Sequence, residues 1–266
     1  MNMKVDLCGV TLNNPVMTAS GTFGSGAEYA EFVDLNKLGA VVTKGVANVP
    51  WPGNPTPRVA EVYGGMLNAV GLQNPGIDLF VERDIPFLKQ FDTKIMVNVC
   101  GHSTEEYIEV VERLRDQPVD LLEINISCPN VKEGGIAFGQ DPKAVEAITK
   151  EMKKHAAQPV IMKLSPNVTD ITEMARAAEA GGADGLSLIN TITGMKIDIN
   201  RQKFVLANKT GGMSGPAIHP VAVRMVYQTA QAVRLPIVGM GGIMNAEDAI
   251  ETVSYTHLTL PTTSRV

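Results

Sequence analysis

Short apolar segments alternate with longer amphipathic segments along most of the chain, and this alternation limits the possible folds more than any other feature. The apolar segments are rich in Val, Ile, Leu and Met, and they lack clean polar alternation, as is typical of parallel strands covered on both faces. Seven strands are expected to begin near Pro15, Ala40, Lys94, Leu121, Pro159, Gly185 and Pro236. Helices are expected between them, at 103–115, 141–155, 169–180 and 216–233. Repeated βα units predict an α/β fold, a (β/α)8 TIM barrel rather than the alternative, a doubly wound sheet.

Local signals support these elements. Ser103 or Thr104 can cap the helix at 103–115, and Asp141 followed by Pro142 suits an N-cap and a first helical position. The opening segment, MKVDLCGVTLNN, resembles a small hairpin that would plug the bottom of the barrel. Two connections, Val46 to Gly76 and Thr191 to Gly215, are long and are expected to be functional lids or binding loops.

Composition narrows the class of protein. Apolar residues make up 44% of the 266 residues and charged residues 19%, which excludes a disordered chain. The net charge of −5 argues against a nucleic-acid partner, and no apolar run has the length of a membrane span. Cys8, Cys100 and Cys128 form no CxxC pair, which argues against a disulfide scaffold and against a metal site. We therefore expect a cytoplasmic protein with no membrane association.

The last residues differ from the rest. An eighth strand and helix should follow the helix that starts near Asn245, yet residues 254–266 are rich in Thr and have no helical period. We expect residues 1–253 to form the barrel with about seven βα units, the eighth being missing or replaced. Residues 254–266 are expected to be a non-native tail; a floppy native terminus is the alternative.

Polar, reactive or glycine residues stand where the expected strands end, and a barrel collects these positions at one face. Lys44 and Lys163 each end an apolar strand, which favours an anionic ligand over two lysines that reach solvent. Asparagine side chains carry both donors and acceptors, so they suit a planar heterocycle with amide edges, although turn chemistry explains a single Asn equally well. The asparagines concerned are Asn68, Asn125, Asn130 and Asn190.

Two further features complete the expected site. Cys128 lies between Ser127 and Pro129 just after a strand, and a free thiol, with a pKa of about 8.5, can act as an acid or base. A buried structural thiol is the alternative for Cys128 and the expectation for Cys8 and Cys100. The GMGGI segment at 239–243 follows the last strand, where barrels often bind phosphate.

These residues resemble class 1 dihydroorotate dehydrogenases. The most telling segment is EINISCPNVKEGG at 123–135, whose end resembles the NAD-linked class 1B catalytic subunit. Further matching motifs are TASGTFG at 18–24, TKGV at 43–46, NAVGLQNPG at 68–76, NVCG at 98–101, MKLSPN at 162–167, NT at 190–191, GGMSGPA at 211–217 and GMGGI at 239–243. The resemblance covers residues 3 to about 252.

The resemblance implies oxidation of dihydroorotate to orotate in pyrimidine biosynthesis with FMN as cofactor. Cys128 is implied to be the base that takes the C5 proton while hydride leaves C6 for FMN, and Lys44 is implied to lie near both substrate and flavin. The implied substrate-binding residues are Lys44, Asn68, Ala69, Val70, Gly71, Leu72, Asn125, Asn130, Asn190 and Thr191. The implied FMN-binding residues are Ser20, Lys44, Gly45, Asn98, Asn125, Lys163, Ile189, Gly215, Gly241 and Gly242.

The resemblance also implies partners. Class 1B catalytic subunits form homodimers and associate with an FAD and iron–sulfur subunit that passes electrons to NAD. The family continues with a Gly-Thr phosphate contact and a closing helix that residues 254–266 do not match, so weakened FMN binding is expected.

Three alternatives stay open on sequence grounds. One is the related flavin domain of dihydropyrimidine dehydrogenases. The second is a Schiff-base lyase barrel that uses Lys163 or Lys44, which leaves Cys128 and the asparagines unexplained. The third is an inactive fragment of the dehydrogenase.

Overall fold

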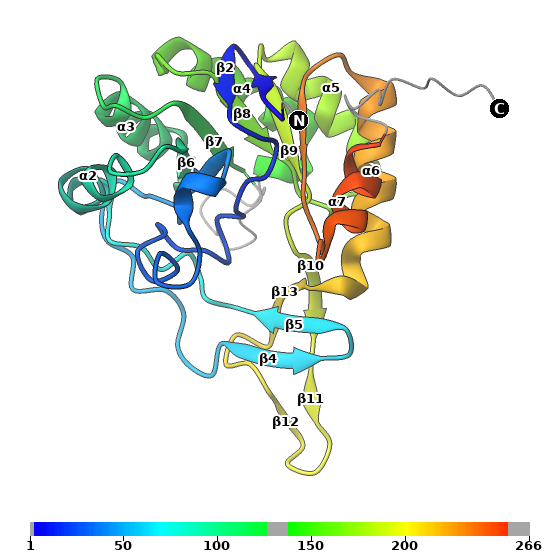
Figure 1. The fold of residues 1–266 in the computed structure, drawn as a ribbon. Helices are drawn as coiled ribbons and strands as arrows, with labels where there is room; N and C mark the ends of the chain where they lie inside the picture. Colours follow the sequence, from blue (N-terminus) through cyan, green and yellow to red (C-terminus); the bar gives the residue numbers. More distant parts are fainter. Residues whose placement is uncertain (1–2, 127–137, 255–266) are drawn as a thin grey trace.

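A six-stranded parallel sheet forms the centre of the computed structural model, which describes residues 3–126 and 138–254 (Figure 1). Its strands stand in the order β14-β9-β8-β7-β6-β3, each parallel to its neighbour. They are β3 (Ala40–Val42), β6 (Lys94–Val99), β7 (Leu121–Asn125), β8 (Val160–Lys163), β9 (Gly185–Leu188) and β14 (Ile237–Gly239). Among the described residues β3 and β14 occupy the two edges, so the sheet is an incomplete barrel and the predicted fold class is confirmed.

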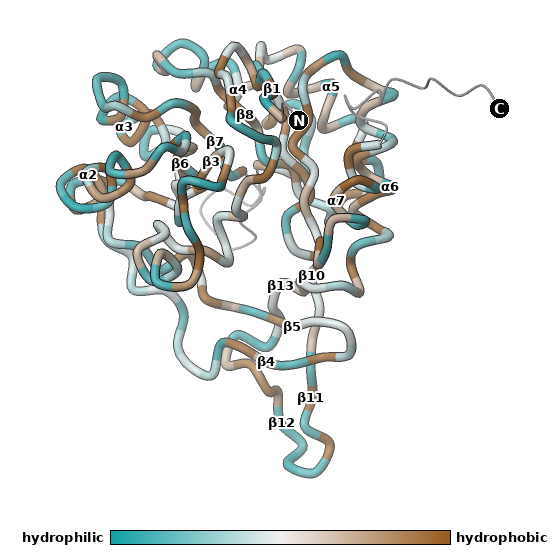
Figure 2. The backbone as a smooth tube through the Cα atoms, in the orientation of Figure 1, coloured by the Kyte–Doolittle hydropathy of each residue, from teal (hydrophilic) through white to brown (hydrophobic). Residues whose placement is uncertain are grey.

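Helices alternate with these strands and pack against one another in chain order. They are α3 (Thr104–Leu114), α4 (Pro142–His155), α5 (Ile171–Ala180), α6 (His219–Ala232) and α7 (Ala246–Val253). The predicted caps are confirmed: Ser103 Oγ accepts a hydrogen bond from the backbone N–H of Glu106, and Asp141 caps α4 with Pro142 in its first turn. Figure 2 shows apolar and polar residues mixed along each helix, as expected for helices with one buried face.

The segment at 15–20, predicted to be the first strand, is not a regular strand. It runs beside β3 but forms only one bridge, between Met17 and Ala40. The Thr18 hydroxyl, rather than a backbone carbonyl, accepts the hydrogen bond from the Val42 N–H at 2.9 Å. A side chain thus replaces a rung of the ladder, which ends regular pairing.

The opening hairpin is as predicted. β1 (Val5–Leu7) and β2 (Val10–Leu12) pair in antiparallel fashion. Leu7 and Leu12 are buried in a cluster with apolar residues of the parallel strands, among them Met96 and Ile161. Figure 1 shows the hairpin at the end of the sheet opposite to the long connections, which is the bottom of the barrel.

The two long connections are not irregular loops but contain strands, while their role as lids or binding loops stays a prediction. They contain β4 (Val59–Val62), β5 (Gly65–Asn68), β10 (Ile192–Met195) and β13 (Thr210–Ser214), which form an antiparallel sheet in the order β10-β13-β5-β4. A further hairpin joins β11 (Ile197–Asp198) to β12 (Lys203–Phe204). The strands are short, β5, β10 and β13 contain glycine, and β13 pairs with β5 from a distant part of the chain, so local patterns gave no strand signal.

Short elements complete the chain. They are the 3-10 turns η1 (Leu35–Lys37), η3 (Phe138–Gln140) and η4 (Pro216–Ile218), the π-helical turn η2 (Phe80–Asp84), and the helical turns α1 (Ile77–Leu79) and α2 (Ile85–Leu88). Within 3–126 and 138–254, no helix has both the length and the apolarity needed to cross a membrane.

Candidate active site at the carboxyl ends of the strands

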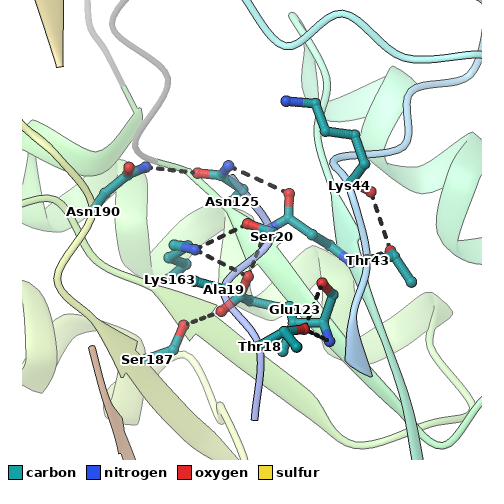
Figure 3. Close-up of polar contacts among 12 residues, drawn as sticks. Thr18, Ala19, Ser20, Thr43, Lys44, Glu123, Asn125, Lys163, Ser187 and Asn190 are labelled. Atoms are coloured by element: carbon teal, nitrogen blue, oxygen red, sulfur yellow. Dashed lines mark hydrogen bonds and ion pairs between the residues drawn. The ribbon is translucent and has the colours of Figure 1, made fainter. Parts of the chain in front are cut away.

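Polar side chains from neighbouring strands meet at the carboxyl end of the parallel sheet, as the sequence predicts. Asn98 on β6, Asn125 at the end of β7 and Lys163 at the end of β8 are each at most 5% exposed. Ser20, from the segment beside β3, is also buried, and its Oγ lies 3.2 Å from Lys163 Nζ. Figure 3 shows Lys163 directed between Ser20 and a buried carboxylate.

That carboxylate belongs to Glu123, which the sequence reasoning did not assign to the site. Glu123 lies on β7 and is completely buried. Its Oε2 lies 3.3 Å from Lys163 Nζ and accepts a hydrogen bond of 2.5 Å from Asn98 Nδ2. Its Oε1 accepts a hydrogen bond of 2.7 Å from Ser187 Oγ on β9. A glutamate inside the apolar segment LLEIN was the signal that could have revealed it, because a buried acid needs a paired cation or several donors.

The asparagines form a connected series. Asn125 Nδ2 donates to Asn98 Oδ1 at 3.4 Å, and Asn190 Nδ2 donates to Asn125 Oδ1 at 3.4 Å. Asn190 Oδ1 in turn accepts the backbone N–H of Thr191 at 2.7 Å. The predicted residues on β6 and β7 and after β9 are therefore brought together.

Lys44 follows β3 and is partly buried. Its backbone N–H donates to the Gly24 carbonyl, and its side chain extends away from Glu123 in Figure 3. Burial lowers the pKa of the Lys44 ammonium below its ordinary value of 10.5, and the Arg58 and Lys163 charges act in the same direction. An anion bound beside Lys44 would relieve this cost.

The predicted substrate segment, Asn68 to Leu72, connects the antiparallel sheet to the barrel. Asn68 ends β5, and its Nδ2 donates to the Gly212 carbonyl of β13 at 3.4 Å. Asn54 fixes the middle of the segment, because its Nδ2 donates to the Ala69 carbonyl and its N–H to the Val70 carbonyl.

The segment from Asn68 to Leu72 ends in two residues with left-handed backbone conformation. Gly71 and Leu72 both have positive φ angles, of 73° and 51°. A Cβ on Gly71 would lie 2.7 Å from the Asn54 side chain, so this position requires glycine.

Thr191 lies beside Gly212, the residue whose carbonyl accepts the hydrogen bond from Asn68. A Cβ on Gly212 would lie 1.9 Å from Thr191 Oγ1, so glycine at position 212 makes room for the threonine. The Thr191 carbonyl accepts a hydrogen bond from Asn167 Nδ2 at 3.0 Å. Asn68 and Thr191, far apart in sequence, therefore both contact the backbone of Gly212.

Three glycines of the predicted FMN site, Gly215, Gly241 and Gly242, lie together near the start of α6 and are called the glycine corner below. Gly215, Gly241 and Gly242 have φ angles of 110°, 129° and 71°, which L side chains rarely adopt. A Cβ on Gly242 would lie 2.7 Å from the Gly215 carbonyl oxygen. Ile189 is buried beside them, 3.3 Å from where a Cβ on Gly241 would stand.

The described residues fit an FMN molecule. The glycine corner lies where α6 begins, since a Cβ on Gly242 would meet the His219 backbone, and Gly215, Gly241 and Gly242 have no side chains to shield their own N–H groups from a phosphate. The buried amides of Asn98 and Asn125 and the Lys163 ammonium offer donors to the edge of a flavin ring. A Cβ on Gly45 would lie 3.0 Å from Asn98 Oδ1, so a side chain at position 45 would press on the Asn98 amide.

Two predicted site residues cannot be placed. Cys128, the predicted base, and Asn130, a predicted substrate contact, lie outside the described residues. Of the other two cysteines, Cys100 is fully buried beside the site, with its Sγ 3.3 Å from where a Cβ on Gly45 would stand, and Cys8 lies in the bottom hairpin. Burial raises the pKa of the Cys8 thiol to about 12, and nearby Asp184 contributes.

Comparisons with known proteins agree with this geometry. A family model described as dihydroorotate dehydrogenase matches residues 2–255. The chain is 75% identical over 253 residues to the "Dihydroorotate dehydrogenase B (NAD(+)), catalytic subunit" of Lachnoclostridium phytofermentans, covering 95% of this chain and 84% of the relative. It is 68% identical over 253 residues, with the same coverage, to the protein of that name from Alkaliphilus metalliredigens.

A solved structure shares the fold. The chain is similar to DHODH from Eimeria tenella, solved in complex with ferulenol, with a TM-score of 0.77. The identity is 21%, and the match covers 95% of this chain and 76% of the solved chain.

Proposed function

The chain belongs to the dihydroorotate dehydrogenase family, and from that premise we propose that it is a class 1B catalytic subunit that oxidises dihydroorotate to orotate with FMN, in pyrimidine biosynthesis. The observation that carries the proposal is the set of buried donors, Lys163, Asn98 and Asn125, at the carboxyl end of the barrel strands. FMN, when bound, supplies the acceptor for the hydride that leaves C6 of the substrate.

FMN would be held by residues of two kinds. The glycine corner of Gly215, Gly241 and Gly242 would bind its phosphate through backbone N–H groups. Ser20, Lys44, Gly45, Asn98, Asn125, Lys163 and Ile189 would line the ring. Lys163 stands ready for negative charge in the ring because Glu123 and Ser20 fix its ammonium in a buried place.

The substrate would be bound on the side of the antiparallel sheet. Lys44 would pair with the carboxylate of dihydroorotate, and the segment from Asn68 to Leu72 would cover it. Asn125, Asn130, Asn190 and Thr191 would bind the amide edges of the pyrimidine ring, since each edge offers both a donor and an acceptor.

Proton removal falls to Cys128 in this proposal. Its thiolate would take the C5 proton, which leaves Cys128 as a thiol and frees the electron pair for the new C5–C6 double bond as hydride departs from C6. A general base contributes about 10²–10⁴-fold to a rate.

A lyase through a Schiff base is the weaker alternative. The lysine of such an enzyme must lose its proton before it attacks a carbonyl. Lys163 Nζ lies 3.3 Å from the buried Glu123 carboxylate and 3.2 Å from Ser20 Oγ, so it is held by these partners rather than presented to a carbonyl.

The relatives' name, a catalytic subunit of an NAD(+) enzyme, supports a separate electron-transfer subunit for this chain as well. We propose that this cytoplasmic partner carries FAD and an iron–sulfur cluster, and that the catalytic subunit is a homodimer. The expected domain boundary at residue 253 stays a prediction, because residues 255–266 lie outside the described part of the chain.

Replacement of the predicted base tests the proposal. Cys128→Ala should slow anaerobic reduction of the bound flavin by dihydroorotate by about 10²–10⁴-fold and leave FMN bound. Cys8→Ala, at the opposite end of the barrel, is the matched control and should reduce at the normal rate. An unchanged rate in Cys128→Ala would remove Cys128 from the base role, and faster reduction by dihydrouracil than by dihydroorotate would contradict the substrate.

A further inference from the structure

Glu123 is a buried charge that the proposed function uses only to fix Lys163. It stands on β7 and contacts one residue on each of three other strands: Asn98 on β6, Lys163 on β8 and Ser187 on β9. It is completely buried and Lys163 is 4% exposed, so solvent does not screen the pair. A buried ion pair is weak evidence for stability, because desolvation can exceed the Coulombic attraction. Its placement beside the predicted flavin contacts therefore calls for another explanation.

The carboxylate restricts the asparagines because it can only accept hydrogen bonds. Asn98 must turn its Nδ2 toward Glu123, so its Oδ1 faces Asn125. Asn125 must then donate with its own Nδ2, which leaves its Oδ1 to accept from Asn190. Each amide orientation follows from the one before, and the first follows from the charge on Glu123.

The same carboxylate sets the local charge. Lys163 and Glu123 form a pair with no net charge, 3.3 Å apart. The pair therefore attracts an electron-rich ring less strongly than a lone lysine would. Removing the carboxylate charge would leave the full positive charge of Lys163 at the site.

We propose that Glu123 is a positioning residue that orients the amides of Asn98, Asn125 and Asn190 and holds down the positive charge of Lys163. It thereby decides which donors and acceptors the site presents to the pyrimidine and how readily the flavin is reduced. The inference rests on the proposed function, because it assigns these residues to flavin and substrate.

The charge is tested by the midpoint potential of bound FMN in Glu123→Gln. This variant keeps the shape of the side chain and removes its charge. The ratio of reduced to oxidised flavin at a fixed potential should rise by about tenfold, which is a shift of about +30 mV for a two-electron couple. Ser187→Ala is the control, since it removes one hydrogen bond to Glu123 and no charge. A potential in Glu123→Gln equal to that of the unmodified protein would overturn the charge role.

The orientation is tested by rescue. In Asn125→Asp, a carboxylate would face Asn98 Oδ1, and Asn98 cannot turn because its Nδ2 is held by Glu123. Both the folding equilibrium and orotate affinity should fall, by about tenfold or more. With Gln at position 123, its amide nitrogen can donate to Asn98 Oδ1, so Asn98 can turn and donate to the new aspartate.

The loss caused by Asn125→Asp should therefore be at least about tenfold smaller in the Glu123→Gln background. Equal losses in the two backgrounds would overturn the orienting role. Because Glu123→Gln also removes the repulsion between Glu123 and the new aspartate, a rescue is combined with neutron diffraction from crystals of the unmodified protein, which must show Asn98 Nδ2 facing Glu123.

The outcomes separate this inference from the proposed function. Failure of the unmodified protein to bind FMN and orotate contradicts the proposed function, while the unfolding measurements still test the orientations without any ligand. If Glu123→Gln does not fold, neutron diffraction from crystals of the unmodified protein distinguishes the amide nitrogen from the oxygen. Asn98 Nδ2 on Glu123 is the expected result, and Asn98 Oδ1 there would overturn the inference.

Discussion

Replacing Lys163 with Met would leave Glu123 buried without its cation, and the structure sets the size of the effect. Breaking a buried ion pair by removing one partner costs about 3–5 kcal/mol. Glu123 keeps its hydrogen bonds from Asn98 and Ser187 in the variant, at 2.5 and 2.7 Å, and these donors offset part of the cost. We therefore expect the free energy of unfolding to fall by about 3 kcal/mol, the lower end of that range.

Urea denaturation of the flavin-free protein, followed by circular dichroism, measures this change. Lys150→Met is the matched control, because Lys150 pairs with Glu146 on the exposed face of α4 and such a pair contributes about 0.3–0.5 kcal/mol. Lys163→Met combined with Glu123→Gln should recover more than half of the loss, since no unpaired charge remains. A loss below about 1 kcal/mol in Lys163→Met, equal to a surface pair, would refute the reasoning that the buried carboxylate depends on Lys163.

Further predictions concern three other residues, Gly212, Lys44 and Cys8. Gly212→Ala should lower the free energy of unfolding by about 1–3 kcal/mol and weaken orotate binding, because the added methyl group would lie 1.9 Å from Thr191 Oγ1. Urea denaturation measures the first effect and orotate titration the second. Lys44 should react with acetic anhydride at lower pH than surface lysines, because burial lowers its pKa, and orotate should protect it. Orotate affinity should fall as pH rises through the folded-state pKa of Lys44, since the anion favours the protonated amine. Cys8, whose pKa is raised to about 12, should resist iodoacetamide at pH 8.5 until the protein is unfolded, as followed by mass spectrometry.

A control or an outcome that would contradict the prediction can be named for each of these three residues. Gly194→Ala, where the nearest atom is the flexible end of Leu67 at 3.1 Å, should cost less than Gly212→Ala; the reverse order would show that Thr191 is not held there. Labelling of Lys44 at the same pH as the surface residue Lys150 would contradict its burial. Rapid alkylation of Cys8 in the folded protein would show that the bottom hairpin does not cover it.

The sequence predicted the barrel well because its strands and helices are local signals. Apolar segments around Val97 and Ile161 are long enough to be recognised alone, and the helix caps at Ser103 and Asp141 are where the pattern places them. Strand ends in a parallel sheet share one edge, so the sequence alone predicts that Asn98, Asn125 and Lys163 lie close together.

The features that the sequence missed depend on distant partners. β5 and β13 pair Asn68 with Gly212, and no pattern within either segment announces this. Only one bridge forms at Met17 because the Thr18 hydroxyl, in place of a backbone carbonyl, accepts the hydrogen bond from the Val42 N–H. Hydrophobicity does not reveal this. Glu123 carried a visible signal, an acid inside an apolar strand, but its partners come from three other strands or segments and could not be chosen from the sequence.

The absorbance spectrum of the purified chain, recorded without oxygen before and after dihydroorotate is added, tests the central claim most directly. The account predicts a yellow protein, or one that becomes yellow when FMN is supplied, whose flavin absorbance bleaches when dihydroorotate is added. A chain that folds but takes up no FMN, or whose bound FMN keeps its absorbance in the presence of dihydroorotate, would contradict it.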